Sequence, residues 1–121
     1  MSARFLEGKP VADAVLADVA ARVEKLKQKG IVPGLGTILV GDDPASAGYV
    51  RKKHETCQTV GIRSFDTRIG ADAAQADLLA AVAAFNGNPD VDAFIIQNPV
   101  PRTFDFNEAL LYMDPQKDAD G

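Results

Sequence analysis

The chain has few of the residues that build disulfide and metal sites. Its 121 residues include one cysteine, one histidine and no tryptophan. One cysteine excludes an intrachain disulfide framework and any site with several cysteine ligands. With only one histidine as well, we expect no structural zinc site and no other bound metal.

Long apolar runs and an excess of positive charge are also missing. No run approaches the roughly 18–20 apolar residues that span a bilayer, and residues 1–7 lack the apolar segment of a signal peptide. Thirteen basic against seventeen acidic residues give a net charge of −4. Proteins that bind nucleic-acid phosphates carry clustered Lys and Arg instead. We therefore expect a cytoplasmic protein that binds neither nucleic acid nor membrane.

What remains is the composition of one globular domain, with 46% hydrophobic and 25% charged residues. Its pattern alternates between helical and strand periods. We predict helices over 10–29, 44–60, 73–85 and 106–113, strands over 35–40, 63–69 and 93–96, and a polar tail over 114–121. This alternation predicts an α/β fold, with mostly parallel strands and helices on both faces.

Two of the predicted helices have informative local signals. Asp43 precedes Pro44, which is typical of a helix start with an acceptor side chain at the N-cap. The first helix carries a stripe of apolar residues at three- and four-residue spacing, made of Val11, Ala14, Val15, Val19, Val23 and Leu26. We expect this stripe to face the rest of the domain.

The loops after the first and third strands are the places to expect a ligand. In an open α/β sheet, ligands bind beyond the carboxyl ends of the strands. These loops span residues 41–46 and 97–101. The chain has no Gly-x-Gly-x-x-Gly or P-loop motif that would turn either of them into a phosphate cradle.

Tyr49 and Lys53 are four residues apart on the second predicted helix and therefore share a face. An aromatic ring beside an amine suits a flat, partly charged ligand, although a pair with this spacing is more often a surface tyrosine packed on a lysine stem. Gln97 follows a buried strand and precedes two prolines that stiffen its loop. A buried amide needs specific partners, and Lys53 is one candidate.

Other polar residues allow more than one interpretation. Asp118 and Asp120 could bind metal, hold a ring N–H edge or belong to a solvated tail. His54 should face away from Lys53, because adjacent helical residues lie about 100° apart. We expect Cys57 to pack as a small apolar group.

Five segments, taken in order, resemble a known family. They are Val40-Gly41-Asp42-Asp43-Pro44-Ala45-Ser46, Tyr49-Val50-Arg51-Lys52-Lys53, Gly61-Ile62, Ile96-Gln97-Asn98-Pro99-Val100-Pro101 and Pro115-Gln116-Lys117-Asp118-Ala119-Asp120-Gly121. The chain resembles the N-terminal catalytic domain of bifunctional methylenetetrahydrofolate dehydrogenase/methenyltetrahydrofolate cyclohydrolase, the FolD family. The implied fold is a three-layer α/β/α domain of the aminoacid dehydrogenase-like N-terminal type.

The resemblance also implies an activity and a set of site residues. The family oxidises 5,10-methylenetetrahydrofolate with NADP and hydrolyses the methenyl product to 10-formyltetrahydrofolate, within one-carbon metabolism. Lys53 matches the catalytic lysine, and Gln97 matches the glutamine that hydrogen-bonds it. The substrate-binding residues implied are Tyr49 for stacking, Asp120 for the pterin edge, and Ser46, Pro99 and Val100 as lining.

Two departures from the family pattern matter. Asn98 stands where the family usually has a leucine, which puts a polar group in an expected apolar wall. The family also continues into a Rossmann-type NADP domain, which we expect to be absent from residues 1–121. We therefore expect one folate-binding catalytic domain, NADP bound mainly elsewhere, and a homodimer only for the full-length protein.

Two other classes fit the length. A receiver-like signalling domain is also a small doubly wound module, and Asp42 and Asp43 would then be its acidic pair. Against this, the third strand ends in Gln97 and not in a phosphorylatable aspartate. The other class is a folate-binding domain without catalysis, for which Asn98 is the best support.

Overall fold

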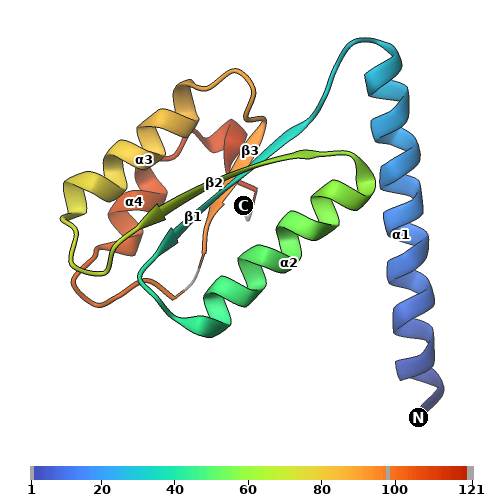
Figure 1. The fold of residues 1–121 in the computed structure, drawn as a ribbon, viewed down its shortest axis with the longest axis horizontal. Coiled ribbons are helices and arrows are strands. Elements are labelled where there is room, and N and C mark those ends of the chain that lie inside the picture. The colour runs from blue at the N-terminus through green and yellow to red at the C-terminus, as the bar shows by residue number, and fades with distance from the viewer. Residues whose placement is uncertain (1, 98, 120–121) are drawn as a thin grey trace.

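A three-stranded parallel sheet forms the centre of the computed structural model, which describes residues 2–97 and 99–119, with side chains from residue 12 onward (Figure 1). In chain order the elements are α1 (Ser2–Gln28), β1 (Gly34–Val40), α2 (Pro44–Val60), β2 (Arg63–Ile69), α3 (Gln75–Gly87), β3 (Ala93–Ile96), α4 (Phe106–Tyr112) and a 3₁₀ helix (Pro115–Lys117). None of the helices described is both long and apolar enough to cross a bilayer.

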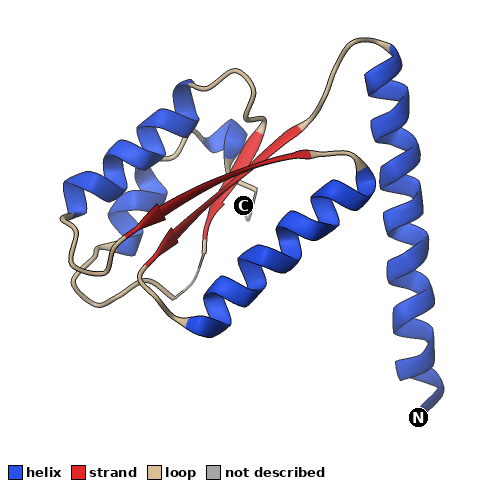
Figure 2. Ribbon diagram, in the orientation of Figure 1, coloured by secondary structure: helices blue, strands red, loops and turns tan. Residues whose placement is uncertain are grey.

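The sheet has the strand order β2-β1-β3, with β1 in the middle and parallel to both neighbours. Figure 2 shows α3 and α4 on one face and α2 on the other, with α1 outside α2. The predicted parallel sheet with helices on both faces is therefore confirmed. Because all three strands run the same way, their carboxyl ends meet at one edge, next to the start of α2.

The main core lies between the sheet and the α3–α4 layer. Phe85 of α3 meets Phe94 of β3 with ring centroids 5.2 Å apart. Gly36 of β1 makes this contact possible, because a Cβ there would lie 2.9 Å from both Phe85 Cε2 and Phe94 Cβ. The buried members of this core are Ile38, Val40, Ile69, Leu78, Val82, Phe85, Val91, Phe94, Ile96, Phe104, Ala109 and Met113.

Helix α2 begins and ends as its sequence predicted. Asp43 is the N-cap, and its Oδ2 accepts a hydrogen bond of 3.1 Å from the backbone N–H of Ser46. Gly61 ends the helix at φ 89°, a left-handed conformation that favours glycine. These two caps define the length of α2 and therefore which of its turns reach the carboxyl edge of the sheet.

The prediction for the first helix was wrong at its start and in part for its apolar stripe. The helix begins at Ser2, eight residues before the predicted start at residue 10. Val23 is buried, whereas Val15 is 56% exposed. The side chain of Val11 lies outside those described. The reason is visible in Figure 1, where α1 stands at the side of the domain and approaches α2 near the end of that helix.

The polar tail was also predicted wrongly, because residues 114–119 are folded against the sheet. Asp114 caps the 3₁₀ helix by accepting from Gln116 N–H at 3.0 Å. Ala119 N–H then donates to Phe94 O at 3.3 Å, beside β3. Lys117 Nζ donates to Phe85 O and Asn88 O at 3.0 Å each. Backbone acceptors at the end of α3 therefore hold a segment whose polarity suggested a solvated tail.

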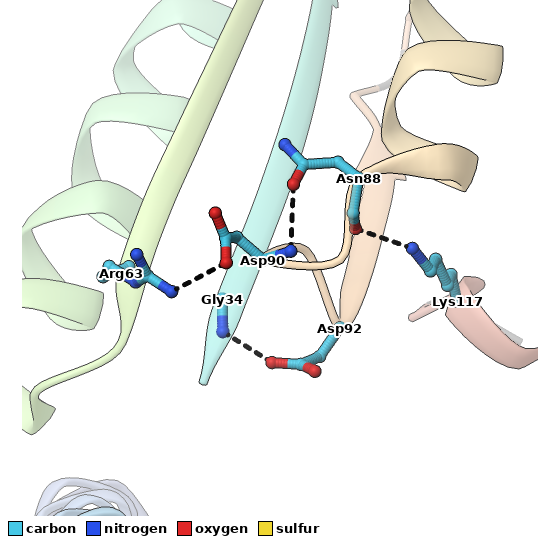
Figure 3. A network of polar contacts seen from close by, with 6 residues as sticks. All are labelled: Gly34, Arg63, Asn88, Asp90, Asp92 and Lys117. Carbon is cyan, nitrogen blue, oxygen red and sulfur yellow. Dashed lines mark hydrogen bonds and ion pairs between the residues drawn. The ribbon is translucent and has the colours of Figure 1, made fainter. Parts of the chain in front are cut away.

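A polar network connects the strands at their amino ends (Figure 3). Asp92 Oδ2 accepts from the N–H of Gly34, the first residue of β1, at 2.8 Å. Asp90 lies between two partners: its N–H donates to Asn88 Oδ1 at 2.9 Å, and its carboxylate pairs with Arg63 at 3.5 Å. These contacts tie the loop before β3 to the starts of β1 and β2, at the edge opposite the predicted ligand loops.

Candidate active site

Lys53 and Gln97 meet at the carboxyl edge of the sheet. Lys53 Nζ donates to Gln97 Oε1 at 2.6 Å, which confirms that the two side chains lie on the same side of the sheet. Gln97 is 9% exposed, and its backbone N–H donates to Ile38 O at 2.9 Å, so that it continues the ladder between β3 and β1. The buried amide therefore has a specific partner, as predicted.

Tyr49 lies one helical turn before Lys53. Both side chains border a cavity of about 480 Å³ between α1 and α2, and Gln97 is not among the residues that line it. The Tyr49 side chain is 58% exposed, which leaves the ring accessible for stacking against a ligand. The remaining lining residues are mostly apolar and come from α1, α2 and the strand starts: Leu16, Val19, Leu35, Lys52, Thr56, Cys57, Val60 and Ile62. An amine and an aromatic ring thus share one largely apolar space.

Sequence reasoning missed one wall of this cavity. Leu16 and Val19 reach it from α1, which no prediction had placed near Lys53. Val19 belonged to the predicted apolar stripe, and its helical spacing signalled a buried face. Spacing within a helix does not say which other element that face meets, so the stripe indicated packing and not a ligand cavity.

Ser46 lies beneath the first turn of α2 and is fully buried. Its Oγ donates to Asp43 Oδ2 at 2.8 Å, beside the N-cap hydrogen bond. In this geometry the serine helps to hold the turn that leads into the Tyr49–Lys53 face. Its part in substrate binding stays a prediction.

The two predicted ligand loops do come together. Residues of both loops line a cavity of about 280 Å³ at the carboxyl edge, together with Ala71. They are Gly41, Asp42, Asp43, Pro99, Val100 and Pro101. Gly41 has φ 89°, and a Cβ there would lie 3.2 Å from Pro101 Cγ, so that the loops pack closely. Pro99 is exposed and Val100 half-buried. Asn98 and Asp120 lie outside the described residues, and their predicted roles stay predictions.

The histidine and the cysteine behave as the sequence indicated. His54 faces away from Lys53, and its Nδ1 lies 2.6 Å from Ser64 Oγ on β2. Cys57 is buried, and desolvation raises the pKa of its thiol. Within the ranges that the structure describes, no three His, Cys, Asp or Glu side chains are placed to hold a metal ion.

The junction between β1 and α2 does not fit the pyrophosphate of a dinucleotide. In a dinucleotide-binding fold this junction is glycine-rich and offers backbone N–H groups to the phosphates. Here Gly41 is followed by Asp42 and Asp43, and Asp43 already accepts the N–H of Ser46. Two carboxylates would repel the pyrophosphate, so residues 1–121 do not supply its site at this position.

Comparison with known proteins agrees with this geometry. The family model described as "Tetrahydrofolate dehydrogenase/cyclohydrolase, catalytic domain" matches residues 6–120. The chain is 68% identical over all 121 residues to the "Bifunctional protein FolD" of Syntrophotalea carbinolica. It covers 42% of that protein, so it spans less than half the length of this curated relative.

Solved structures share the fold. The bifunctional FolD methylenetetrahydrofolate dehydrogenase/cyclohydrolase of Campylobacter jejuni superposes with a TM-score of 0.92 and 32% identity, over 95% of this chain and 41% of that one. The FolD of Trypanosoma brucei, solved with NADP cofactor and inhibitor, gives 0.90 and 33%, over 93% of this chain and 39% of that one.

Proposed function

The chain belongs to the tetrahydrofolate dehydrogenase/cyclohydrolase catalytic-domain family, and from this premise we propose that it provides the folate site of a bifunctional enzyme. The proposed enzyme oxidises 5,10-methylenetetrahydrofolate with NADP and hydrolyses the resulting 5,10-methenyltetrahydrofolate to 10-formyltetrahydrofolate. The observation that carries the proposal is the 2.6 Å contact of Lys53 Nζ with Gln97 Oε1, one helical turn from Tyr49. Family membership also weighs against a receiver-like signalling domain.

Hydrolysis needs a group that moves protons beside an electrophilic carbon. Water adds to the cationic methenyl carbon, and the neutral Lys53 amine takes the proton that this water loses. The resulting ammonium then protonates N5 as the carbon–N5 bond breaks, and the carbinol oxygen becomes the formyl oxygen when its own proton leaves. The net reaction consumes one water and releases one proton.

Gln97 suits this role because it orients the lysine without adding a charge. Its Oε1 accepts from Lys53 Nζ whether the amine is neutral or protonated. A carboxylate in its place would stabilise the ammonium and withdraw the base from the reaction.

We assign substrate binding to the residues around this pair. The accessible Tyr49 ring stacks on the flat part of the folate. The Asp120 carboxylate accepts two parallel N–H bonds from the amino-pyrimidine edge of the pterin. Ser46, Pro99 and Val100 line the same site. Asn98 makes one wall more polar than the family pattern.

The oxidation step requires a dinucleotide site, and the acidic β1–α2 junction does not provide one. We therefore place NADP mainly on residues beyond 1–121, and hydride transfer would need both parts of the enzyme. We also propose that the full-length protein forms a homodimer and is cytoplasmic, and that its product supplies purine, histidine and methionine biosynthesis.

The test is hydrolysis of 5,10-methenyltetrahydrofolate by the full-length protein and by its Lys53→Met variant. Loss of the methenyl absorbance reports the rate. Removing a general acid–base group costs about 100- to 10,000-fold, and we expect a loss of this size. Circular dichroism and binding of a folate analogue should be unchanged, since methionine keeps the length of the side chain.

Lys25→Met is the matched control, because Lys25 is exposed on α1 and should leave hydrolysis unaffected. Hydrolysis by Lys53→Met at the parent rate would show that the lysine assignment is wrong. If the parent protein binds the folate analogue but hydrolyses nothing, the domain is a folate-binding module without catalysis.

A further inference from the structure

Helix α2 has a second flank that the folate site does not use. Successive residues turn by about 100°, so Ala47, Arg51 and His54 lie on the side away from Tyr49 and Lys53. This flank faces the edge strand β2. Gly48 adds to the room there, because a Cβ on it would meet nothing within 4 Å.

The register of the sheet decides which β2 side chains face this flank. Ser64 pairs with Leu35 and Arg68 with Leu39, and both β1 residues belong to the face that α2 covers. Asp66 lies between them on the same face, since side chains alternate along a strand. Two basic residues of α2 and one of β2 therefore approach one space with a single carboxylate beside them.

That space is a cavity of about 490 Å³ at the carboxyl-end half of β2. It is lined by Pro44, Ala47, Gly48, Val50, Arg51, His54, Asp66 and Arg68. His54 is held in place by the 2.6 Å contact of its Nδ1 with Ser64 Oγ. No hydrogen bond from another described residue engages its Nε2.

The two arginines are exposed at the cavity and form no direct ion pair with another described residue. Among residues 12–97 and 99–119, the ion pairs are Arg22–Asp18 and Arg63–Asp90, and neither arginine of the cavity takes part. This is notable in a chain with a net charge of −4. Two guanidinium groups that line one cavity without an ion-pair partner in the part of the chain that the structure describes favour an anion with two charges.

We propose that this cavity, here called the α2–β2 cavity, binds the phosphate group of a small phosphorylated molecule. Arg51 and Arg68 would hold the phosphate, and His54 Nε2 would donate a third hydrogen bond. Asp66 would accept from a hydroxyl of the same ligand, which explains an acid in an anion site. The site lies on the opposite flank of α2 from Lys53 and does not depend on the proposed folate chemistry.

Nitrogen-15 NMR titration of the protein with glycerol 3-phosphate, inorganic phosphate, citrate and glycerol tests the proposal. We expect glycerol 3-phosphate to shift the signals of residues 47–54 and 64–68, and glycerol to shift none. Arg51→Gln and Arg68→Gln should each weaken binding about tenfold, the effect of losing one charge-assisted hydrogen-bonded pair. Asp66→Asn should weaken the binding of glycerol 3-phosphate and leave the binding of inorganic phosphate unchanged.

Arg22→Gln is the control, because Arg22 is an exposed arginine on α1 that lies outside the α2–β2 cavity. Arg51→Lys keeps the charge and should bind glycerol 3-phosphate with intermediate affinity. Binding by this variant would show that a substitution at position 51 leaves the domain folded. The proposal is overturned by any of three results: millimolar glycerol 3-phosphate shifts no signal, a variant with both Arg51→Gln and Arg68→Gln binds it like the parent, or citrate binds as tightly as glycerol 3-phosphate. Folate-analogue binding, measured separately, is expected to be unchanged in every variant.

Discussion

At the scale of single residues, the lysine of the candidate site depends on a partner that is far away in the chain. Gln97 lies 44 positions from Lys53, yet its Oε1 accepts from Nζ at 2.6 Å. The sequence could suggest this pair only because each residue was unusual where it stood: an amine beside a tyrosine, and an amide after a buried strand. Their distance was decided by the packing of α2 against the sheet, where it contacts β1 and β2.

Replacing the amide by a carboxylate should move the pH dependence of hydrolysis. In Gln97→Glu the new charge lies close to Lys53 Nζ and favours the ammonium form, so the neutral amine appears only at higher pH. We expect the pH–rate profile to shift upward by about one pH unit or more, with a lower rate near neutrality. Gln58→Glu places the same change on the other flank of α2 and should leave the profile in place.

Cys57 should react slowly with alkylating reagents. Burial raises the pKa of its thiol, so the thiolate is scarcer at a given pH than for a free cysteine. Iodoacetamide at about pH 8 should modify the folded protein more slowly than glutathione, and mass spectrometry would follow the product. Modification should become fast in urea; a fast reaction of the folded protein would contradict the buried position.

At the scale of elements, β1 shows how a central position in the sheet restricts which residues a strand can contain. Its burial is nearly continuous, as its apolar run predicted. Gly36 is the exception in size, and the closeness of Phe85 and Phe94 explains it. Nothing in the sequence around Gly36 indicates that two rings cross at this point.

A methyl group at position 36 should therefore destabilise the domain. In Gly36→Ala the added Cβ would lie 2.9 Å from Phe85 Cε2 and must displace the ring. Overpacking of this kind costs about 1–3 kcal/mol in the free energy of unfolding, measured by urea titration. Gly87→Ala is the comparison, because a Cβ there meets nothing within 4 Å. Equal stability of both variants would contradict the packing described.

At the scale of the whole molecule, contacts at the amino edge of the sheet fix the relative positions of the strands. The candidate site at the opposite edge depends on those positions. Asp92 fixes the start of β1 through the Gly34 N–H, and Lys117 ties the segment after α4 to the end of α3. Neither residue belongs to the candidate site. Both residues connect parts of the chain that are distant in sequence, so their contacts stabilise the domain as a whole.

Loss of the Lys117 ammonium should release the segment that follows α4. In Lys117→Met the carbonyl groups of Phe85 and Asn88 lose a donor at 3.0 Å. A cost of about 1–3 kcal/mol in the free energy of unfolding is expected. Amide exchange of Ala119, whose N–H donates to Phe94 O, should also become faster. Lys29→Met, at an exposed position, should change neither quantity.

The sequence by itself determined the order and type of the helices and strands through α4, the caps of α2 and the choice of residues that we propose for the site. These depend on local periodicity, on single side chains such as Asp43, and on motifs that can be read in order. Only the tertiary structure decided that Leu16 and Val19 border the cavity of Tyr49 and Lys53, that residues 114–119 lie against β3, and that Arg51 and Arg68 line one cavity. Each of these depends on how separate elements pack, and side-chain spacing within one element carries no information about its neighbour.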